Sequence, residues 1–153
     1  MTIEEGQMFP DFELSDQDGN MVSLNDLKGK AAVVYFYPKD DTSGCTTQAC
    51  EFRDLMPSID GARVIGISPD NQKSHLKFAS KYDLNFTLLT DEDHRLAEEL
   101  GLWVEKTLYG RKYMGVDRTT FLLDQEGRVA KIWRKVTPAG HAAEVQAALT
   151  GRR

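Results

Sequence analysis

The sequence lacks several features that define whole classes of protein. Only two cysteines occur in 153 residues, which argues against a disulfide-stapled secreted scaffold. The longest apolar run, Ala31–Tyr37, has seven residues, whereas a membrane span needs about 20. The first residues, Met1–Gly6, have neither the positive start nor the apolar stretch of a secretion signal. We therefore expect a cytoplasmic protein whose two cysteines are reactive or buried rather than structural.

Basic residues are also in the minority. Nineteen Lys and Arg against 24 Asp and Glu give a net charge of −5, which offers no general attraction to phosphate backbones or anionic lipid. We expect no nucleic-acid partner and no membrane association. The rest of the composition, 41% hydrophobic and 28% charged, is that of a soluble globular protein. Because no linker, low-complexity tract or internal repeat divides the chain, residues 1–153 are predicted to form one domain.

The hydrophobic pattern predicts an α/β protein in which strands and helices alternate. Residues 11–24 indicate a hairpin, and the continuous run Ala31–Tyr37 predicts a strand buried on both faces. Further strands are expected at Arg63–Ser68, Phe86–Leu89, Thr119–Asp124 and Arg128–Val136, and helices at Ser43–Met56, 71–82, Asp93–Leu100 and Gly140–Leu149. Residues 102–118 predict a long functional loop or short strands. This order predicts a thioredoxin-like fold, with a central mixed β-sheet flanked by helices and an N-terminal hairpin extension.

Cys45 has the strongest local pattern. A polar loop follows Pro38, and Thr42 and Ser43 are good N-cap residues for a helix whose first turn would contain Cys45. There the unpaired backbone N–H groups and the positive end of the helix dipole favour a thiolate. Three further apolar residues share the helix face of Cys45: Ala49, Phe52 and Met56. The alternative is that Cys45 is a small buried hydrophobic residue without chemistry.

Cys50 lies five residues after Cys45, and this spacing restricts how the two can pair. Five residues along an α-helix rise about 7.5 Å and rotate about 140°, which separates the Cα atoms by about 8.7 Å. A disulfide needs Cα atoms closer than about 7 Å. The cysteines can therefore pair only if the first helical turns unravel; alternatively, Cys50 never meets Cys45. The spacing is not C-x-x-C, so neither a thioredoxin-type redox motif nor a zinc knuckle is indicated.

Taken together, these residues resemble a known family, the peroxiredoxins of the bacterioferritin-comigratory-protein or peroxiredoxin Q type. The central match is Pro38-x-x-x-Thr42-x-x-Cys45, with Cys50 in the same helix. Similar segments extend over essentially the whole chain: Gly66-Ile67-Ser68, Leu88-Leu89-Thr90-Asp91-Glu92-Asp93-His94, Gly101-Leu102-Trp103 and Gly110–Phe121. Ser43 stands where many members have a second proline, so the loop before the helix is expected to be less rigid.

The resemblance implies a thiol peroxidase and gives each residue a role. Cys45 would be the peroxidatic cysteine, which becomes a sulfenic acid, and Cys50 the resolving cysteine, which condenses with it after the helix start unfolds locally. Thr42 would bridge the sulfur and the peroxide through its hydroxyl. Pro38 would shield the site from water, and Arg118 would hold the thiolate and the leaving oxygen.

The resemblance also implies the partners. The substrates would be hydrogen peroxide and organic hydroperoxides, and thioredoxin or a similar dithiol protein would reduce the resulting disulfide. No cofactor and no metal are implied. Because the resolving cysteine is internal, a monomer is the simplest expectation.

Each role has a simpler structural alternative. Pro38 could merely end a strand, Thr42 could merely cap a helix, and Arg118 could be a solvated charge at a strand end. The charged residues near Cys45 in the sequence are mostly acidic: four carboxylates (Asp40, Asp41, Glu51 and Asp54) outnumber two cations (Lys39 and Arg53). This excess of negative charge disfavours a thiolate. The mechanism therefore needs a cation from a distant segment, and Arg118 is the natural supplier; Arg53, about two helical turns beyond Cys45, is the competing cation.

Two other functions fit part of the pattern. A thiol–disulfide oxidoreductase acting on proteins would be expected to carry C-x-x-C, which the sequence does not have. A redox-sensing or holdase-like binding module would be oxidised once and wait, whereas a peroxidase turns over. The peroxidase is the interpretation that accounts for the largest number of residues.

Two smaller predictions concern residues outside the cysteine segment. His75, His94 and His141 form no metal-ligand spacing, so surface or helix-cap roles are expected. In the helix over 71–82, an apolar face is predicted from three residues at helical spacing: Leu76, Ala79 and Tyr82.

Overall fold

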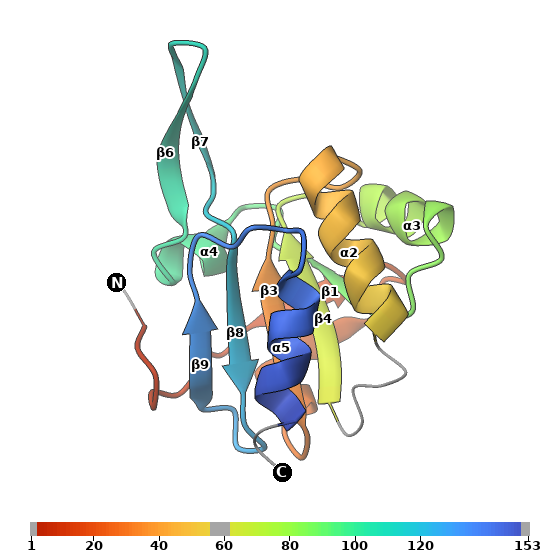
Figure 1. Ribbon diagram of the computed structural model, residues 1–153, viewed down its shortest axis with the longest axis vertical. Helices are drawn as coiled ribbons and strands as arrows, with labels where there is room; N and C mark the ends of the chain where they lie inside the picture. Colours follow the sequence, from red (N-terminus) through yellow and green to blue (C-terminus); the bar gives the residue numbers. More distant parts are fainter. Residues whose placement is uncertain (1–2, 56–61, 151–153) are drawn as a thin grey trace.

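A seven-stranded mixed sheet forms the middle of the molecule in the computed structural model, which describes residues 3–55 and 62–150 (Figure 1). In the order β2-β1-β5-β4-β3-β8-β9, the sheet consists of β1 (Glu13–Asp16), β2 (Met21–Ser23), β3 (Ala31–Phe36), β4 (Ala62–Ser68), β5 (Thr87–Thr90), β8 (Thr119–Leu123) and β9 (Val129–Trp133). The helices are α1 (Leu24–Leu27), α2 (Ser43–Leu55), α3 (Gln72–Lys81), α4 (Arg95–Glu99) and α5 (His141–Thr150). A separate two-stranded sheet pairs β6 (Trp103–Leu108) with β7 (Arg111–Val116).

The apolar run that begins at Ala31 forms the central strand, β3. It pairs in parallel with β4 and antiparallel with β8. Side chains alternate in direction along a strand, so Val33 and Tyr35 enter one hydrophobic cluster whereas Val34 and Phe36 enter the other. The strand is therefore buried on both faces, as its unbroken apolar sequence predicts.

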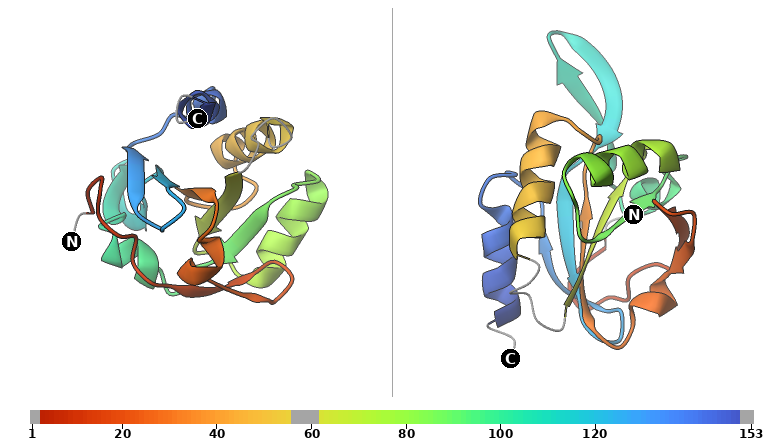
Figure 2. Two further views of the ribbon diagram at one scale, coloured as in Figure 1. Left: turned by 90° about the horizontal axis from the view of Figure 1, so that it is seen from below. Right: turned by 90° about the vertical axis from the view of Figure 1, so that its right-hand side faces the viewer.

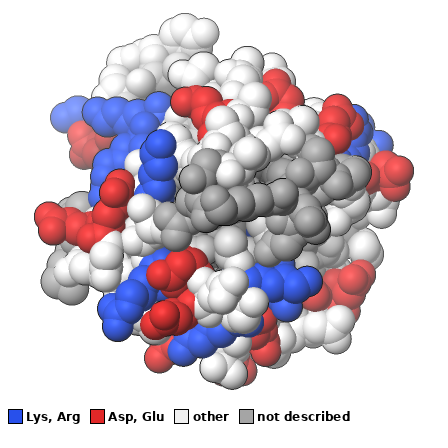
Figure 3. Space-filling model, turned by 60° about the horizontal axis from the view of Figure 1, so that its bottom comes forward, with Lys and Arg blue, Asp and Glu red and all other residues white. Residues whose placement is uncertain are grey.

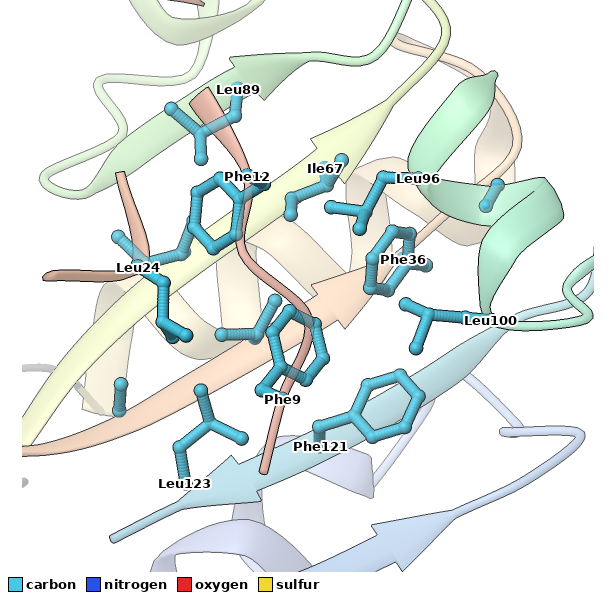
Figure 4. Packing of buried hydrophobic residues seen from close by; sticks show 14 of the residues in the cluster. Phe9, Phe12, Leu24, Phe36, Ile67, Leu89, Leu96, Leu100, Phe121 and Leu123 are labelled. Atoms are coloured by element: carbon cyan, nitrogen blue, oxygen red, sulfur yellow. The ribbon is translucent and has the colours of Figure 1, made fainter. Parts of the chain in front are cut away.

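The two hydrophobic clusters lie on opposite faces of the sheet. One is covered by α2, α3 and α5, and the other by α1, α4 and the N-terminal segment (Figure 2). Figure 4 shows the second cluster, in which Phe9 and Phe36 each pack edge-to-face on Phe121. Because β3, β4 and β5 are parallel, their carboxyl ends meet at one edge of the sheet, and the loop after β3 leads directly into α2. That edge is where the cysteine helix begins.

The predicted mixed α/β sheet and its N-terminal hairpin are confirmed, and one open segment is resolved. Residues 102–118, expected as a loop or short strands, form the β6–β7 hairpin, which projects from the body (Figure 1). The short helix α1 was not predicted, since its four residues are too few for a periodic pattern. The predicted helix end at Met56 and Pro57 lies outside the described residues. Within the part of the chain that the structure describes, no helix has the length and apolarity needed to cross a membrane.

The predicted inner face of α3 was partly wrong. Leu76 is 46% exposed, whereas His75 and Phe78 are buried. The expected surface or cap roles are also wrong for His75 and His141, which are 0% and 1% exposed; His94 does occupy the N-cap position of α4. Burial lowers the pKa of His141, whose Nε2 lies 2.8 Å from the Thr120 hydroxyl. A helix buries the side chains whose polar atoms find partners inside, and His75 has such partners.

Candidate active site

Cys45 lies in the first turn of α2, as predicted. The Thr42 carbonyl accepts the N–H of Thr46 at 2.8 Å, so Thr42 stands at the N-cap and Cys45 is the third residue of the helix. The Cys45 side chain is buried, at 1% exposure, on the face that also buries Ala49 and Phe52. The thiol thus lies buried at the positive end of the helix dipole.

Arg118 provides the cation at this thiol. It lies between β7 and β8, and its Nη2 donates to the Cys45 Sγ at 3.2 Å. Its Nη1 donates to the Gln48 Oε1 at 2.6 Å. The planar guanidinium therefore binds two atoms of α2 at once, and its orientation is fixed by the pair. A carboxamide that holds the arginine in place was not predicted from the sequence.

Gln48 is the site residue that the sequence reasoning missed. It is 0% exposed, three residues after Cys45 and therefore on the same side of α2. Its Oε1 is engaged by Arg118, whereas its Nε2 is a buried donor without a hydrogen-bond partner. The available signal was a polar residue inside an otherwise apolar helix face. A buried free N–H beside the thiol can donate to an oxygen that reaches the sulfur.

Gly44 gives the guanidinium room to approach the helix. A Cβ at this position would lie 3.3 Å from the Arg118 Nη2 and 3.1 Å from the Pro138 Cγ. Both distances are tighter than ordinary van der Waals contact. A larger residue would therefore press on the guanidinium that contacts Cys45.

The competing cation is engaged elsewhere. Arg53 donates to the Asp54 carboxylate at 2.9 Å and to the Tyr82 carbonyl at 2.7 Å. The structure thus places Arg118, and not Arg53, in contact with the Cys45 thiol.

The two remaining loop residues lie close to this centre in the chain. Thr42 is exposed, and its hydroxyl donates to the Lys39 carbonyl at 2.9 Å. Pro38 is half-buried and directly follows Tyr37, the last buried aromatic residue of the strand segment. Within residues 3–55 and 62–150, the Cys45 sulfur receives its hydrogen bond from Arg118, and the Thr42 hydroxyl is engaged by the Lys39 carbonyl.

Cys50 lies in the second half of the same helix, half-buried, and both cysteines are free thiols. The helix between them is intact, so the structure shows the reduced form. The two sulfurs cannot join in this conformation, because five helical residues hold their Cα atoms too far apart.

A buried polar network anchors the loop that precedes α2. Asp40 is 7% exposed, and its carboxylate accepts the Tyr37 hydroxyl at 2.5 Å and the Ser74 hydroxyl at 2.8 Å. His75 lies between Asp40 and β5: its Nδ1 is 2.7 Å from the Asp40 Oδ2, and its Nε2 is 2.9 Å from the Leu89 carbonyl. Both ring nitrogens thus face oxygen atoms, and His75 joins Asp40 to the Leu89 carbonyl through buried polar contacts.

This network also contains the group of side chains with metal-ligating chemistry. The ligand atoms of Asp40, Asp70 and His75 all lie within 4.8 Å of one another. The Asp70 Oδ2, however, already accepts the Asp40 backbone N–H at 2.8 Å and the Ser68 hydroxyl at 2.6 Å. Since the facing atoms are engaged in hydrogen bonds, the group holds the loop to β4 and α3.

We expect Asp40→Asn to lower the free energy of unfolding by about 2 kcal/mol, because the amide NH2 cannot accept all the hydrogen bonds that the buried carboxylate receives from its neighbours. Urea denaturation followed by circular dichroism would measure the change. The matched control is Asp41→Asn at the next position, where the carboxylate pairs with Lys81 at the surface and little change is expected. Equal destabilisation by the two variants would contradict the assignment of Asp40 to a buried polar network.

The fold and this site define a class of protein: a thiol-based enzyme on a thioredoxin-like sheet, whose cysteine is buried at a helix start against an arginine. A family model described as the AhpC/TSA family matches residues 5–132. The chain belongs to this family and, within it, to the peroxiredoxins of the Bcp or peroxiredoxin Q type, which are peroxidases.

Individual relatives support the same conclusion. Peroxiredoxin Bcp of Bacillus subtilis is 53% identical over 146 residues, which cover 94% of this chain and 93% of that protein. A putative peroxiredoxin Bcp of Coxiella burnetii is 51% identical over 147 residues, covering 95% and 97%.

Solved structures show that the fold is shared. Bacterioferritin comigratory protein of Xanthomonas campestris, studied for its alkyl peroxide reduction activity, superposes with a TM-score of 0.90 at 40% identity, covering 97% of this chain and 99% of that one. A peroxiredoxin Q mutant of Xylella fastidiosa gives a TM-score of 0.93 at 33% identity, covering 99% and 98%. The predicted thioredoxin-like fold is thereby confirmed.

Proposed function

We propose that Cys45 is the residue through which this peroxiredoxin reduces hydrogen peroxide and organic hydroperoxides. The Cys45 thiolate attacks one peroxide oxygen, the O–O bond breaks, and a sulfenic acid forms as hydroxide or alkoxide leaves. Arg118 stabilises both the thiolate and the negative charge on the departing oxygen. The observation that carries this proposal is the 3.2 Å contact between the Arg118 Nη2 and the buried Cys45 Sγ.

Thr42 and Pro38 complete the proposed site. The Thr42 hydroxyl, at the N-cap position of the cysteine helix, would move from the Lys39 carbonyl to bridge the sulfur and the bound peroxide. The half-buried Pro38 ring would exclude water from the thiolate. The Thr42 hydroxyl would place the peroxide in line with the sulfur, where positioning contributes most to the rate.

The sulfenic acid is then condensed by Cys50, which forms an intramolecular disulfide and releases water. This step requires the start of α2 to unwind, and the local structure favours that opening. Gly44 and two threonines give the segment modest helix propensity, and the Thr47 hydroxyl donates back to the Ser43 carbonyl at 3.1 Å.

The later part of α2 is anchored and would stay folded. The Glu51 carboxylate accepts the Gly140 N–H at 2.8 Å, which ties the helix to the start of α5. Phe52 stacks on Tyr35 with ring centroids 4.9 Å apart. The opening is therefore confined to the turns that contain Cys45 and Cys50.

A thioredoxin-type dithiol protein would reduce the disulfide and return the enzyme to its starting state. Because both cysteines lie in one helix, a single chain completes the cycle, which supports a monomeric, single-domain enzyme. Two free thiols that must be regenerated by a dithiol suit a reducing compartment such as the cytoplasm.

Intact mass spectrometry after one equivalent of hydrogen peroxide tests this proposal. We expect the loss of two hydrogens, because the disulfide forms without net addition of oxygen, at a rate orders of magnitude above that of a simple free thiol. Oxidation at the rate of the free thiol would show that Cys45 is not activated.

We further expect Cys50→Ser to keep the fast first oxidation but to stop at the sulfenic acid. The mass would then increase by one oxygen, and a sulfenic-acid trap would convert this species into the trap adduct. Turnover supported by thioredoxin and its reductase would be lost. If Cys50→Ser cycled as fast as the natural protein, internal resolution by Cys50 would be wrong.

A further inference from the structure

The β6–β7 hairpin, called the arm below, stands beside the proposed active site. It forms its own two-stranded sheet and projects from the end of the molecule at which α2 begins (Figures 1 and 2). Strands of six residues give it a length of about 20 Å. Asp117 and Arg118 follow directly at its base. The arm and the start of α2 therefore lie at the same end of the molecule.

Lys106 joins the two strands at the base of the arm. Its Nζ donates to the Val116 carbonyl at 2.6 Å, two residues before Arg118. Burial lowers the pKa of Lys106, and the Arg118 guanidinium lowers it further, whereas Asp117 and Cys45 act in the opposite direction. The ammonium thus lies within the electrostatic field of the reactive thiol.

The arm exposes apolar surface that the body does not cover. Four of the seven large hydrophobic side chains that are exposed in the described residues belong to it: Leu108 (55% exposed), Tyr109 (95%), Tyr113 (47%) and Met114 (48%). A two-stranded hairpin is marginal when it packs on nothing. Exposed aromatic and aliphatic side chains beside arginine are typical of protein–protein contact sites.

The charges are divided between the two faces of the arm. The strand register places Lys106 opposite Tyr113 and Leu108 opposite Arg111, so one face carries two cations and two apolar side chains with no acidic residue. On the other face, Glu105 and Lys112 lie 3.8 Å apart and offset each other. The single-sign face contrasts with the end of the molecule opposite the arm, where both signs are interspersed (Figure 3).

We propose that this face of the arm, formed by Lys106, Leu108, Arg111 and Tyr113 with Tyr109 at the tip, docks the acidic dithiol protein that reduces the Cys45–Cys50 disulfide. The proposal rests on the function proposed above. The reductant is the macromolecule that has to bring its own sulfur into bonding distance at this end of α2. An acidic surface would complement the two cations, and a partner on the arm would cover its apolar side chains.

The chemistry at the docked complex is a balanced dithiol–disulfide exchange. A thiolate of the partner attacks one sulfur of the Cys45–Cys50 bond, which gives a mixed disulfide and releases the other cysteine as a thiolate. The second thiol of the partner then attacks the mixed disulfide. The partner leaves as a disulfide, and two electrons and two protons have passed to the chain. A small dithiol performs the same exchange without needing a docking surface.

The test compares a protein reductant with a small one in the full chain. For the double variant Arg111→Glu with Tyr113→Ser, we expect kcat/KM for a thioredoxin of net negative charge to fall at least tenfold, mainly through KM. The salt dependence of that kcat/KM should also flatten. Turnover supported by dithiothreitol, and the first oxidation by one equivalent of hydrogen peroxide, should stay within twofold. Arg128→Glu, in the β8–β9 turn at the opposite end, is the matched charge control and should behave as the natural protein.

The outcomes separate the docking proposal from the proposed function. Thioredoxin-supported turnover that survives in the double variant, or that falls equally in Arg128→Glu, would overturn docking on the arm. If the natural protein turned over with dithiothreitol but not with the acidic thioredoxin, the claim that the docking partner is an acidic dithiol protein would be wrong. If neither reductant supports turnover, the proposed function itself fails.

Discussion

Cys45→Ser is expected to reduce peroxide consumption to the uncatalysed level. A serine hydroxyl remains protonated where a cysteine at a helix start ionises, and oxygen cannot take the place of sulfur in a sulfenic acid. The substitution is nearly isosteric in a site where the side chain is 1% exposed, so the fold should persist. The measurement is the disappearance of hydrogen peroxide with dithiothreitol as the reductant.

The Cys50→Ser variant is the matched control, since it removes the other thiol of the same helix. With one equivalent of peroxide and no reductant, it should consume peroxide rapidly, whereas Cys45→Ser should not. Peroxide consumption that persists in Cys45→Ser and vanishes in Cys50→Ser would exchange the roles of the two cysteines.

Arg118→Met is expected to slow the first oxidation by about 10²–10³-fold, the loss typical of removing one group that stabilises an oxyanion. The substitution removes the cation that contacts the Cys45 Sγ and also the donor to Gln48. Arg118→Lys should restore only part of the rate, because an ammonium keeps the charge but cannot reach both α2 atoms as a planar fork. Stopped-flow tryptophan fluorescence or competition with a free thiol would give the rate constants.

Arg53→Met is the control for this prediction. It removes a cation from α2, the helix that contains Cys45, but this cation pairs with Asp54 and the Tyr82 carbonyl and does not contact the sulfur. Its first oxidation should match that of the natural protein. A similar loss in both arginine variants would mean that general positive charge, and not the contact with the sulfur, determines the rate.

Much of the fold could be predicted because its elements carry local patterns. The unbroken apolar run of β3 indicates a strand buried on both faces, and a first-turn cysteine after a threonine indicates the start of α2. The arm lacks such a pattern. Both of its faces are largely exposed, so its apolar and polar residues do not alternate with the period of a half-buried strand. The burial of His75 could not be predicted either. Burying an imidazole usually costs free energy, and the hydrogen-bonding partner that offsets this cost, Asp40, lies 35 residues away in the sequence.

The site shows the same division between local and distant information. Cys45 could be predicted as the reactive residue from its own helix, and the acidic sequence around it indicated that a cation must come from elsewhere. Arg118 was then supplied by the family resemblance, and the structure places it on the sulfur. Gln48 was missed because the sequence gives no reason for a polar residue on the buried face of this helix. The reason is the hydrogen bond that its Oε1 accepts from the Arg118 guanidinium. That guanidinium arrives from a strand junction 70 residues further along the chain.

In the proposed mechanism, the contact between Arg118 and Cys45 would also set when the chain becomes reactive. The two residues are 73 positions apart, so at about 5–20 residues per second the thiol leaves the ribosome on the order of ten seconds before its arginine. Until β8 pairs with β3 and holds the guanidinium beside the helix, Cys45 lacks this activating contact. Under the proposed roles, the order of synthesis would delay peroxide sensitivity in the nascent chain, and rapid oxidation would mark the chains that have finished folding.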